Sequence, residues 1–296
     1  MIYLFLIIIL LFFIFIIYNK TRKNFVLCLM YHSVDSEKGK GGIFVDEFQE
    51  HIKWIKDKKT FKMEELKNLN YTLPQNSILI TFDDGYKNNY TLAFPILKKY
   101  NMKATIFLNT KFIGEDEDYL NWDEIKEMYQ SGLIDFQLHT HSHYPTIRKA
   151  EIKGFFEKTE GDFVKREYFS IFREGLSKKE KAEIKDFRDL DFTGLPVFKI
   201  RSQISIKGMK LKEGFMDKYR EIVNSEEFKG KSSKEQKIFL NKLFKEQKKE
   251  FFEEISDEEF EKRVEFEISE NKRLIEEKLN KKAEFLSYPW GHAYKG

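Results

Sequence analysis

The chain of 296 residues has little cysteine, little proline and little net charge. Cys28 is its single cysteine, so no disulfide can form within the chain, and its place in an apolar run predicts a core residue. The net charge of +3 is too small to indicate a nucleic-acid partner, and no basic stripe is interleaved with aromatic residues. Repeats and low-complexity tracts are absent from the sequence. The length suits one large domain or two small ones.

The sequence does contain an unbroken apolar run at its start, from Met1 to Tyr18. At about 1.5 Å per residue, ~18 helical residues reach roughly 27 Å, close to the thickness of the hydrocarbon core of a bilayer. A cleavable signal peptide fits poorly, because no charged region precedes the run and no small-residue cleavage site follows it. A buried core helix is the other alternative. We expect a single membrane anchor over residues 1–18.

The residues after this anchor bear on its orientation. Lys20, Arg22 and Lys23 follow the apolar run, and only the α-amino group precedes it. The positive-inside rule therefore favours a cytoplasmic catalytic domain. Short N-terminal anchors break this rule, and our prediction is a catalytic domain outside the cytoplasm.

Strands alternate with helices in the first half of the chain. The predicted buried strands and amphipathic helices cover, in order, residues 25–31, 45–56, 77–82, 88–100, 104–108, 122–130 and 134–139. This alternation is typical of parallel β/α units, in which catalytic residues collect at the carboxyl ends of the strands. We expect an α/β fold whose first part covers residues 24–149.

The middle of the chain, residues 150–255, differs in composition. Lys, Glu and Phe dominate it, residues 197–200 are predicted to form a strand and residues 234–252 a helix. It contains no cluster of catalytic residue types, and its charges are interpreted as solvated helix faces. We therefore predict a charged, mostly helical insertion that serves as a lid or a partner surface. The fold then resumes over residues 256–296.

Two short motifs concentrate the chemistry. Thr81-Phe82-Asp83-Asp84-Gly85 follows a buried strand directly, and His139-Thr140-His141-Ser142-His143 holds three of the six histidines. Two adjacent carboxylates repel each other unless a cation offsets them. One carboxylate and two histidines can form a three-ligand metal site with an open position. A hairpin turn and an exposed polar loop are the respective alternatives, but together the motifs predict a metal site.

These two motifs resemble those of the polysaccharide deacetylases of carbohydrate esterase family 4, the NodB-homology group. The resemblance covers residues 25–146 and about 257–296, and it implies a distorted (β/α) barrel. It further implies that Asp83 is the catalytic base and that Asp84, His139 and His143 hold a divalent metal. Zinc is the expected ion, with Co²⁺, Ni²⁺ or Mn²⁺ as alternatives. His141 falls on a variable position of the motif.

The general acid is implied by a third motif. Leu29-Met30-Tyr31-His32-Ser33-Val34 resembles the N-terminal motif of the biofilm poly-N-acetylglucosamine deacetylases, where a histidine takes the acid role. The resemblance makes His32 the candidate acid, and a histidine satisfied by local hydrogen bonds is the alternative. Other family members supply this acid from a late Leu-x-His segment. The sequence stops before such a segment, so it is either a fragment or a barrel with unusual closure.

The end of the sequence supplies the predicted substrate contacts. Tyr288-Pro289-Trp290-Gly291 resembles the groove-wall motif of the family without its arginine, whose place falls near Leu286 or Ser287. Tyr288, Pro289 and Trp290 are the predicted contacts, although Trp290 suits a core position equally well. By resemblance, the backbone N–H of Tyr86 stabilises the oxyanion. The neighbouring His292 has no assigned role.

Together these residues predict a metal-dependent hydrolase that removes N-acetyl groups from an amino-sugar polysaccharide or glycolipid at the membrane. Asp83 would deprotonate a water activated by the metal, and His32 would protonate the departing amine. One alternative is a deformylase or deacetylase of a lipid-linked sugar at the cytoplasmic face. Another is a non-catalytic glycan-binding protein on the same fold. The expected partners are the glycan and the membrane, and no nucleic acid.

Overall fold

The computed structural model describes residues 7, 9–17, 26–39, 41–159 and 161–293. The chain divides into two compact units, which are described separately. Unit 1 comprises residues 1–138 and 274–286, and unit 2 comprises residues 139–273 and 287–296. Part of the predicted anchor over residues 1–18 lies outside the described residues. Within the described part of the chain, no helix has the length and apolar character needed to cross a membrane.

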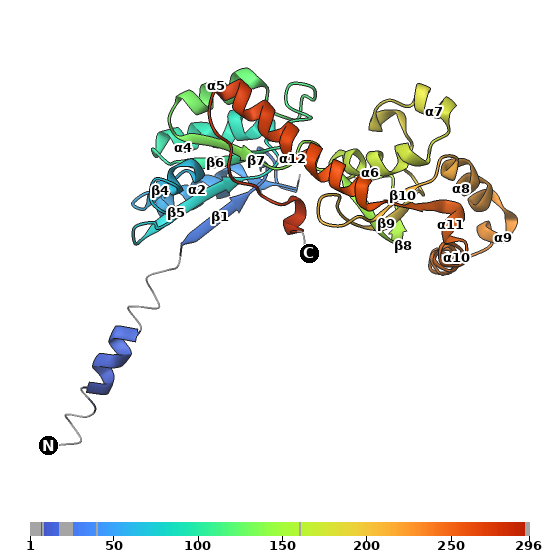
Figure 1. Ribbon diagram of the computed structural model, residues 1–296, viewed down its shortest axis with the longest axis horizontal. Coiled ribbons are helices and arrows are strands. Elements are labelled where there is room, and N and C mark those ends of the chain that lie inside the picture. Colours follow the sequence, from blue (N-terminus) through green and yellow to red (C-terminus); the bar gives the residue numbers. More distant parts are fainter. Residues whose placement is uncertain (1–6, 8, 18–25, 40, 160, 294–296) are drawn as a thin grey trace. The chain divides into compact units, whose positions relative to one another are not determined.

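Unit 1 is built on a parallel sheet. Its strands run in the order β1-β5-β6-β7, with β4 paired to β5, and their bounds are β1 Leu27–Tyr31, β4 Lys59–Phe61, β5 Ser77–Phe82, β6 Ala104–Leu108 and β7 Ile134–Leu138. β5, β6 and β7 are buried along their whole length, as expected for parallel strands covered on both faces. Figure 1 shows these strands side by side. The predicted α/β class is confirmed, whereas closure into a barrel is not.

Helices follow the strands of unit 1. They are α2 Val45–Ile55, α3 Met63–Leu66, α4 Phe94–Lys99 and α5 Trp122–Gln130, and a short parallel pair of strands, β2 Val34–Asp35 and β3 Ile43–Phe44, precedes α2. α2 buries Phe48, Ile52 and Ile55, the face that its spacing predicts. The helix predicted over residues 88–100 is instead one π-helical segment, η1 Asn89–Ala93, followed by α4. Pro95 supplies no backbone donor at the start of α4, which suits the change of helix type there.

Strand β1 departs from the prediction of a buried strand. Its side chains alternate in exposure, with Leu27, Leu29 and Tyr31 packed against the core and Met30 61% exposed. Successive side chains of a strand point to opposite faces, so this alternation shows that only one face of β1 is covered. Cys28 points to the uncovered face and is exposed, so its predicted place in the core is wrong.

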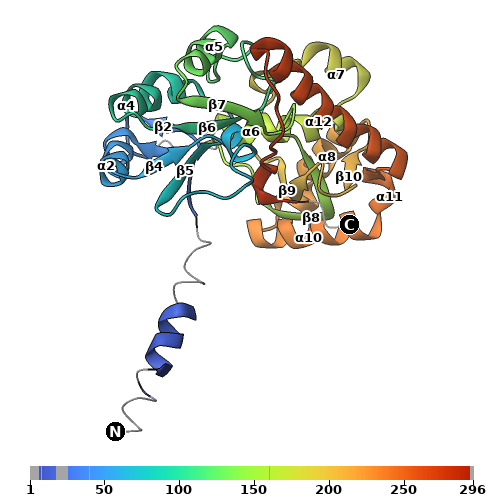
Figure 2. The same ribbon diagram turned by 60° about the vertical axis from the view of Figure 1, so that its left-hand side comes forward.

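Unit 2 contains an antiparallel sheet that the sequence did not predict. The strands β8 Pro145–Phe155, β9 Pro196–Ser202, β10 Met209–Leu211 and β11 Phe252–Glu254 lie in the order β11-β10-β8-β9. Helices pack around them (Figure 2), with bounds α6 Asp162–Gly175, α7 Lys178–Glu183, α8 Phe215–Asn224, α9 Glu226–Lys229, α10 Ser233–Glu246 and α11 Lys248–Phe251. Phe172, Phe198, Phe215 and Phe244 are fully buried at the centre. The middle of the chain therefore has its own aromatic core.

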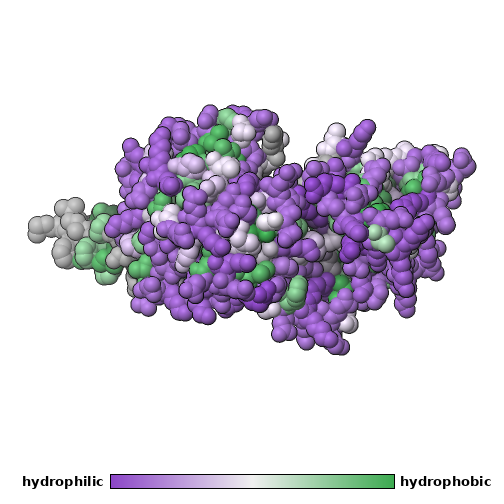
Figure 3. Space-filling view, turned by 90° about the horizontal axis from the view of Figure 1, so that it is seen from above, coloured by the Kyte–Doolittle hydropathy of each residue, from purple (hydrophilic) through white to green (hydrophobic). Residues whose placement is uncertain are grey.

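The long helix α12, Asp257–Leu279, belongs to both units. It begins after Ser256, whose Oγ accepts a hydrogen bond from the Glu259 N–H at 3.1 Å. After α12, the chain returns to β7, where the backbone N–H of Glu284 donates a hydrogen bond to the Gln137 side-chain oxygen at 2.9 Å. The face seen in Figure 3 is mainly hydrophilic, in keeping with a composition that is 34% charged.

Candidate metal centre

The Asp pair lies at the carboxyl end of β5. The Asp83 N–H donates to the Tyr31 carbonyl at 2.9 Å, which extends the pairing of β5 with β1 by one residue. Asp84 is 1% exposed, and its Oδ1 accepts a hydrogen bond at 2.9 Å from the side chain of Asn109, just beyond β6. The Oδ1 atom of Asn109 is buried and has no hydrogen-bond partner among the described residues. The carboxylates of Asp83 and Asp84 therefore lie in a buried, polar environment at the carboxyl end of β5.

The histidine motif continues directly from β7. His139 Nδ1 lies 2.9 Å from the Ser287 carbonyl oxygen. A carbonyl oxygen can only accept, so Nδ1 carries the proton and the lone pair of the neutral ring is on Nε2. His143 Nδ1 lies 2.9 Å from Oε1 of Glu167 on α6, which favours the same tautomer. Such contacts orient a histidine for metal binding through Nε2.

The structure brings the three predicted ligands together. Asp84, His139 and His143 each offer one potential ligand atom, these atoms lie within 4.8 Å of one another, and all three residues are buried. A carboxylate and two imidazoles form a donor set that suits Zn²⁺ and its neighbours in the first transition row. Asp84 and His143 also adopt positive φ angles, of 75° and 57°, which cost free energy in a non-glycine residue. Strain of this kind is typical of functional sites, and the residues fit a divalent metal.

The C-terminal motif includes one aromatic residue next to a candidate ligand. The Trp290 ring lies 4.3 Å from the His143 ring, centroid to centroid, and Trp290 is partly buried with φ 53°. Tyr288 is 38% exposed and Pro289 is buried. The motif lacks the arginine of the family, but the backbone carbonyl of Ser287 in the same segment orients His139.

His292, which follows this motif, accepts a hydrogen bond from the Ser202 N–H at 3.3 Å. Burial, with Arg201 and Arg148 nearby, lowers the His292 pKa.

Comparison with known proteins connects this geometry to a family. The sequence profile described as polysaccharide deacetylase matches residues 70–168, a stretch that contains Asp83, Asp84, His139 and His143. This stretch is a polysaccharide deacetylase domain.

Two curated relatives are similar to this chain in sequence. A Bacillus subtilis protein that is named as a polysaccharide deacetylase is 41% identical to this chain over 131 residues. These residues cover 42% of this chain and 46% of that protein. The poly-beta-1,6-N-acetyl-D-glucosamine N-deacetylase of Staphylococcus aureus is 32% identical over 183 residues, which cover 58% of this chain and 59% of that protein. The chain thus spans about half the length of these relatives.

A solved structure shares the fold over more of the chain. It is a de-N-acetylase from Aggregatibacter actinomycetemcomitans, with a TM-score of 0.54, 16% identity, and coverage of 91% of this chain and 81% of that chain. At this identity the likeness concerns the fold alone. It supports a NodB-type fold with mixed α and β content.

The contacts of His32 and Tyr86 leave the roles of these two residues as predictions. His32 is exposed, and its backbone carbonyl accepts a hydrogen bond from the Asn89 side chain at 2.8 Å. The Tyr86 ring stacks on the Tyr119 ring with centroids 5.2 Å apart. His141, on the variable position, packs its ring edge-on against Phe266 at 5.5 Å.

The sequence reasoning missed the residues that hold the histidine loop. The Glu267 carboxylate accepts from the Ser142 N–H at 2.8 Å and from the Ser142 hydroxyl at 2.6 Å. Asn271 accepts from the His139 N–H at 3.1 Å. Both residues are buried on α12, in line with its apolar residues Phe260 and Ile275. Polar residues within an apolar helical stripe were the available signal.

Glu167 was also missed, because it lies within the predicted insertion. Nothing in the local sequence of α6 distinguishes it from the other glutamates of this charged region. Only the fold places its carboxylate against His143.

Proposed function

We propose that this chain is a metal-dependent N-deacetylase of an amino-sugar polymer or glycolipid. The cluster of Asp84, His139 and His143, with Asp83 beside it on the same strand end, is the observation that supports this most strongly. The name of the staphylococcal relative supports an N-acetylated glucosamine polymer as the substrate class. The strongly apolar start of the sequence supports action close to a membrane.

Each residue has a definite task in this proposal. A divalent ion, when bound, supplies a Lewis acid that polarises an amide carbonyl and lowers the pKa of water. Asp83 is 5% exposed, and its backbone is pinned to β1, so its carboxylate is held in one place to accept a proton. The Tyr86 N–H is the proposed donor to the developing oxyanion. His32 is the proposed donor of a proton to the departing amine.

The Trp290 ring is the proposed platform for the sugar. An indole face next to a metal ligand would place a pyranose ring close to the reacting amide. Its partial burial leaves part of the ring accessible. Tyr288, which is more exposed, would contact a sugar unit further along the polymer.

The test is a paired measurement of bound metal and of released acetate on the purified full chain. We expect about one divalent ion per chain by elemental analysis, and acetate release from oligomers of N-acetylglucosamine that stops with a chelator. Asp84→Asn should lose both properties. Asp57→Asn, an exposed carboxylate far from the motifs in sequence, is the matched control and should lose neither. A folded chain that binds no divalent metal would overturn the proposal.

A further inference from the structure

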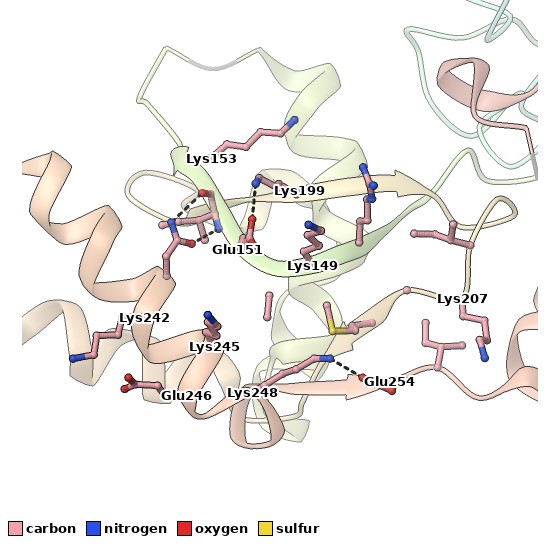
Figure 4. A pocket seen from close by; sticks show the side chains of 18 of the residues that line it. Lys149, Glu151, Lys153, Lys199, Lys207, Lys242, Lys245, Glu246, Lys248 and Glu254 are labelled. Atoms are coloured by element: carbon pink, nitrogen blue, oxygen red, sulfur yellow. Dashed lines mark hydrogen bonds and ion pairs between the residues drawn. The ribbon is translucent and has the colours of Figure 1, made fainter. Parts of the chain in front are cut away.

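Unit 2 contains a large groove that the chemistry of the deacetylase motifs does not involve. Its volume is ≈ 1260 Å³, and all of its lining residues fall between Arg148 and Ile255, within unit 2. Figure 4 shows side chains reaching it from β8 and β9 on one side and from α10 on another. Three glutamates line it, Glu151, Glu246 and Glu254. The basic residues that line it are three times as many: Arg148, Lys149, Lys153, Lys199, Lys207, Lys237, Lys242, Lys245 and Lys248.

An irregular strand concentrates this charge. In a regular strand, successive side chains point to opposite faces. The pairing of β8 with β9 has register shifts between Ile147 and Gly154, and all six residues from 148 to 153 line the groove. Asn241 of α10 ties this irregular stretch down, since its side chain accepts from the Ile152 N–H at 2.7 Å. Arg148, Lys149 and Lys153 therefore share one rigid wall.

The carboxylates of unit 2 neutralise only a minority of these charges. Lys199 pairs with Glu151 at 2.5 Å, Lys248 with Glu254 at 2.6 Å, and Lys207 with Asp257 at 2.9 Å. Among the described residues, no carboxylate oxygen lies within 4.0 Å of the other six basic groups, which are Arg148, Lys149, Lys153, Lys237, Lys242 and Lys245. A concave site with a surplus of positive charge attracts anions from solution.

The positive charge of the groove also affects the ionisation of Glu151, one of the glutamates that line it. The hydrogen bond from Lys199 lowers the pKa of Glu151, and the positive charges of Lys149 and Lys245 act in the same direction. Lysines from β8, β9 and α10 thus act electrostatically on one carboxylate. Because these lysines are far apart in the sequence, the sequence analysis did not predict that they lie close together.

We propose that this groove binds a linear polymer that carries phosphate groups. Lysine ammonium groups bind phosphate as compact point charges, and lysines form nearly all of the basic lining of the groove, which has a single arginine. Its lining contains no aromatic side chain, so it offers no surface on which nucleic-acid bases could stack. A concave wall also fits a chain better than it fits a flat bilayer.

This binding is separate from the proposed deacetylation. A sugar polymer that has lost its acetyl groups carries ammonium groups, and the groove would repel it. The site would instead hold the protein on an anionic polymer while the deacetylase residues act elsewhere. Its test can therefore succeed or fail whatever the outcome for acetate release.

The experiment measures binding of fluorescent poly(glycerol phosphate) to the full chain by anisotropy, at several salt concentrations. We expect saturable binding that weakens with salt. The groove variant K149Q/K242Q/K245Q should bind about tenfold to a hundredfold more weakly. The control K178Q/K179Q/K185Q removes three exposed lysines of unit 2 outside the groove and should change the affinity less than about twofold.

Several results would overturn the inference. The proposal fails if the wild-type chain does not bind the polymer, or if both triple variants lose the same affinity. It also fails if single-stranded DNA of equal charge binds more tightly than poly(glycerol phosphate), since bases would then be recognised. Preferential binding to phosphatidylglycerol vesicles that the groove variant alone loses would assign the groove to a lipid surface instead. Circular dichroism of both variants checks that each remains folded.

Discussion

The two units use their charged residues in different ways. In unit 1, Asp83 and Asp84 are buried at the end of a rigid strand. In unit 2, the lysines of the groove are mostly exposed and spread over β8, β9, α10, α11 and the loop before β10. A few charges fixed inside a protein can perform chemistry, because burial makes each interaction strong. Many solvated charges provide only a diffuse field, which suits the binding of a long anion. The same residue classes thus support different functions according to burial.

The largest expected effect is that of Asp83→Asn, which tests the proposed role of a buried carboxylate of unit 1 in catalysis. We expect the rate of acetate release to fall by about 10²–10⁴-fold, because a proton acceptor is lost. Bound metal should stay at the wild-type level, since Asp84, His139 and His143 remain. Elemental analysis of the same sample checks this. An unchanged rate would move the base role to another residue.

The independence of the two cores is tested by one substitution in each. Phe198→Ala in unit 2 and Phe136→Ala in unit 1 remove fully buried rings, and each should cost about 3–5 kcal/mol of the free energy of unfolding. We expect each variant to expose mainly its own unit to limited proteolysis. Cleavage of both units to the same extent in both variants would show that the two cores unfold together.

The proposed acid is tested by His32→Gln. The rate of amide hydrolysis should fall by about 10²-fold, because the amine leaves poorly without a proton. Hydrolysis of an aryl acetate should change little, since a phenolate leaves without one. His51→Gln, another exposed histidine of unit 1, is the control. Equal losses on both substrates would contradict an acid role and indicate a positioning role.

Glu167 of α6 contacts the candidate ligand His143. Glu167→Gln should weaken metal binding by about 10–100-fold, because the amide accepts the His143 Nδ1–H less strongly than a carboxylate does. Competition with a chelator of known affinity measures this change. Glu174→Gln, an exposed glutamate of the same helix, should leave the affinity unchanged. Equal affinities in the two variants would reduce Glu167 to a structural residue.

The smallest expected effect concerns a surface ion pair of unit 2. Burial opposes ionisation of Glu180, but hydrogen bonds from Arg220 and Ser177 lower its pKa. A lowered folded-state pKa stabilises the protein above the unfolded pKa and loses this effect as pH falls through the folded value. Arg220→Gln should therefore cost about 0.2–1 kcal/mol near neutral pH and less near pH ~3.

Urea unfolding at both pH values measures this cost, with Arg173→Gln as the control. A cost that grows on acidification would contradict the assignment. A small cost would also agree with our view that the charges of unit 2 contribute little to stability.

Residue order and type predicted most of the strands of unit 1 and the types of residue that could hold a metal. The apolar run of β5 predicts a buried strand, and the carboxylate pair at its end predicts a metal site only together with the histidine motif. The spacing of His139 and His143 then predicts two ligands of one metal. The same local reasoning misplaced Cys28, because exposure of β1 depends on what covers the sheet. It also could not predict the antiparallel sheet of unit 2, whose strands pair over long separations in sequence.

The sequence by itself therefore determined the strand ends, the ligand types and the family resemblance, because these depend on neighbouring residues. Only the tertiary structure decided which residues support the site and where the lysines of unit 2 converge. Glu167, Glu267 and Asn271 reach the histidine loop from helices that are distant in sequence. The groove likewise combines charges from β8, β9, α10, α11 and β11 and from the loop that holds Lys207. Contacts of this kind arise from packing, which no local pattern encodes.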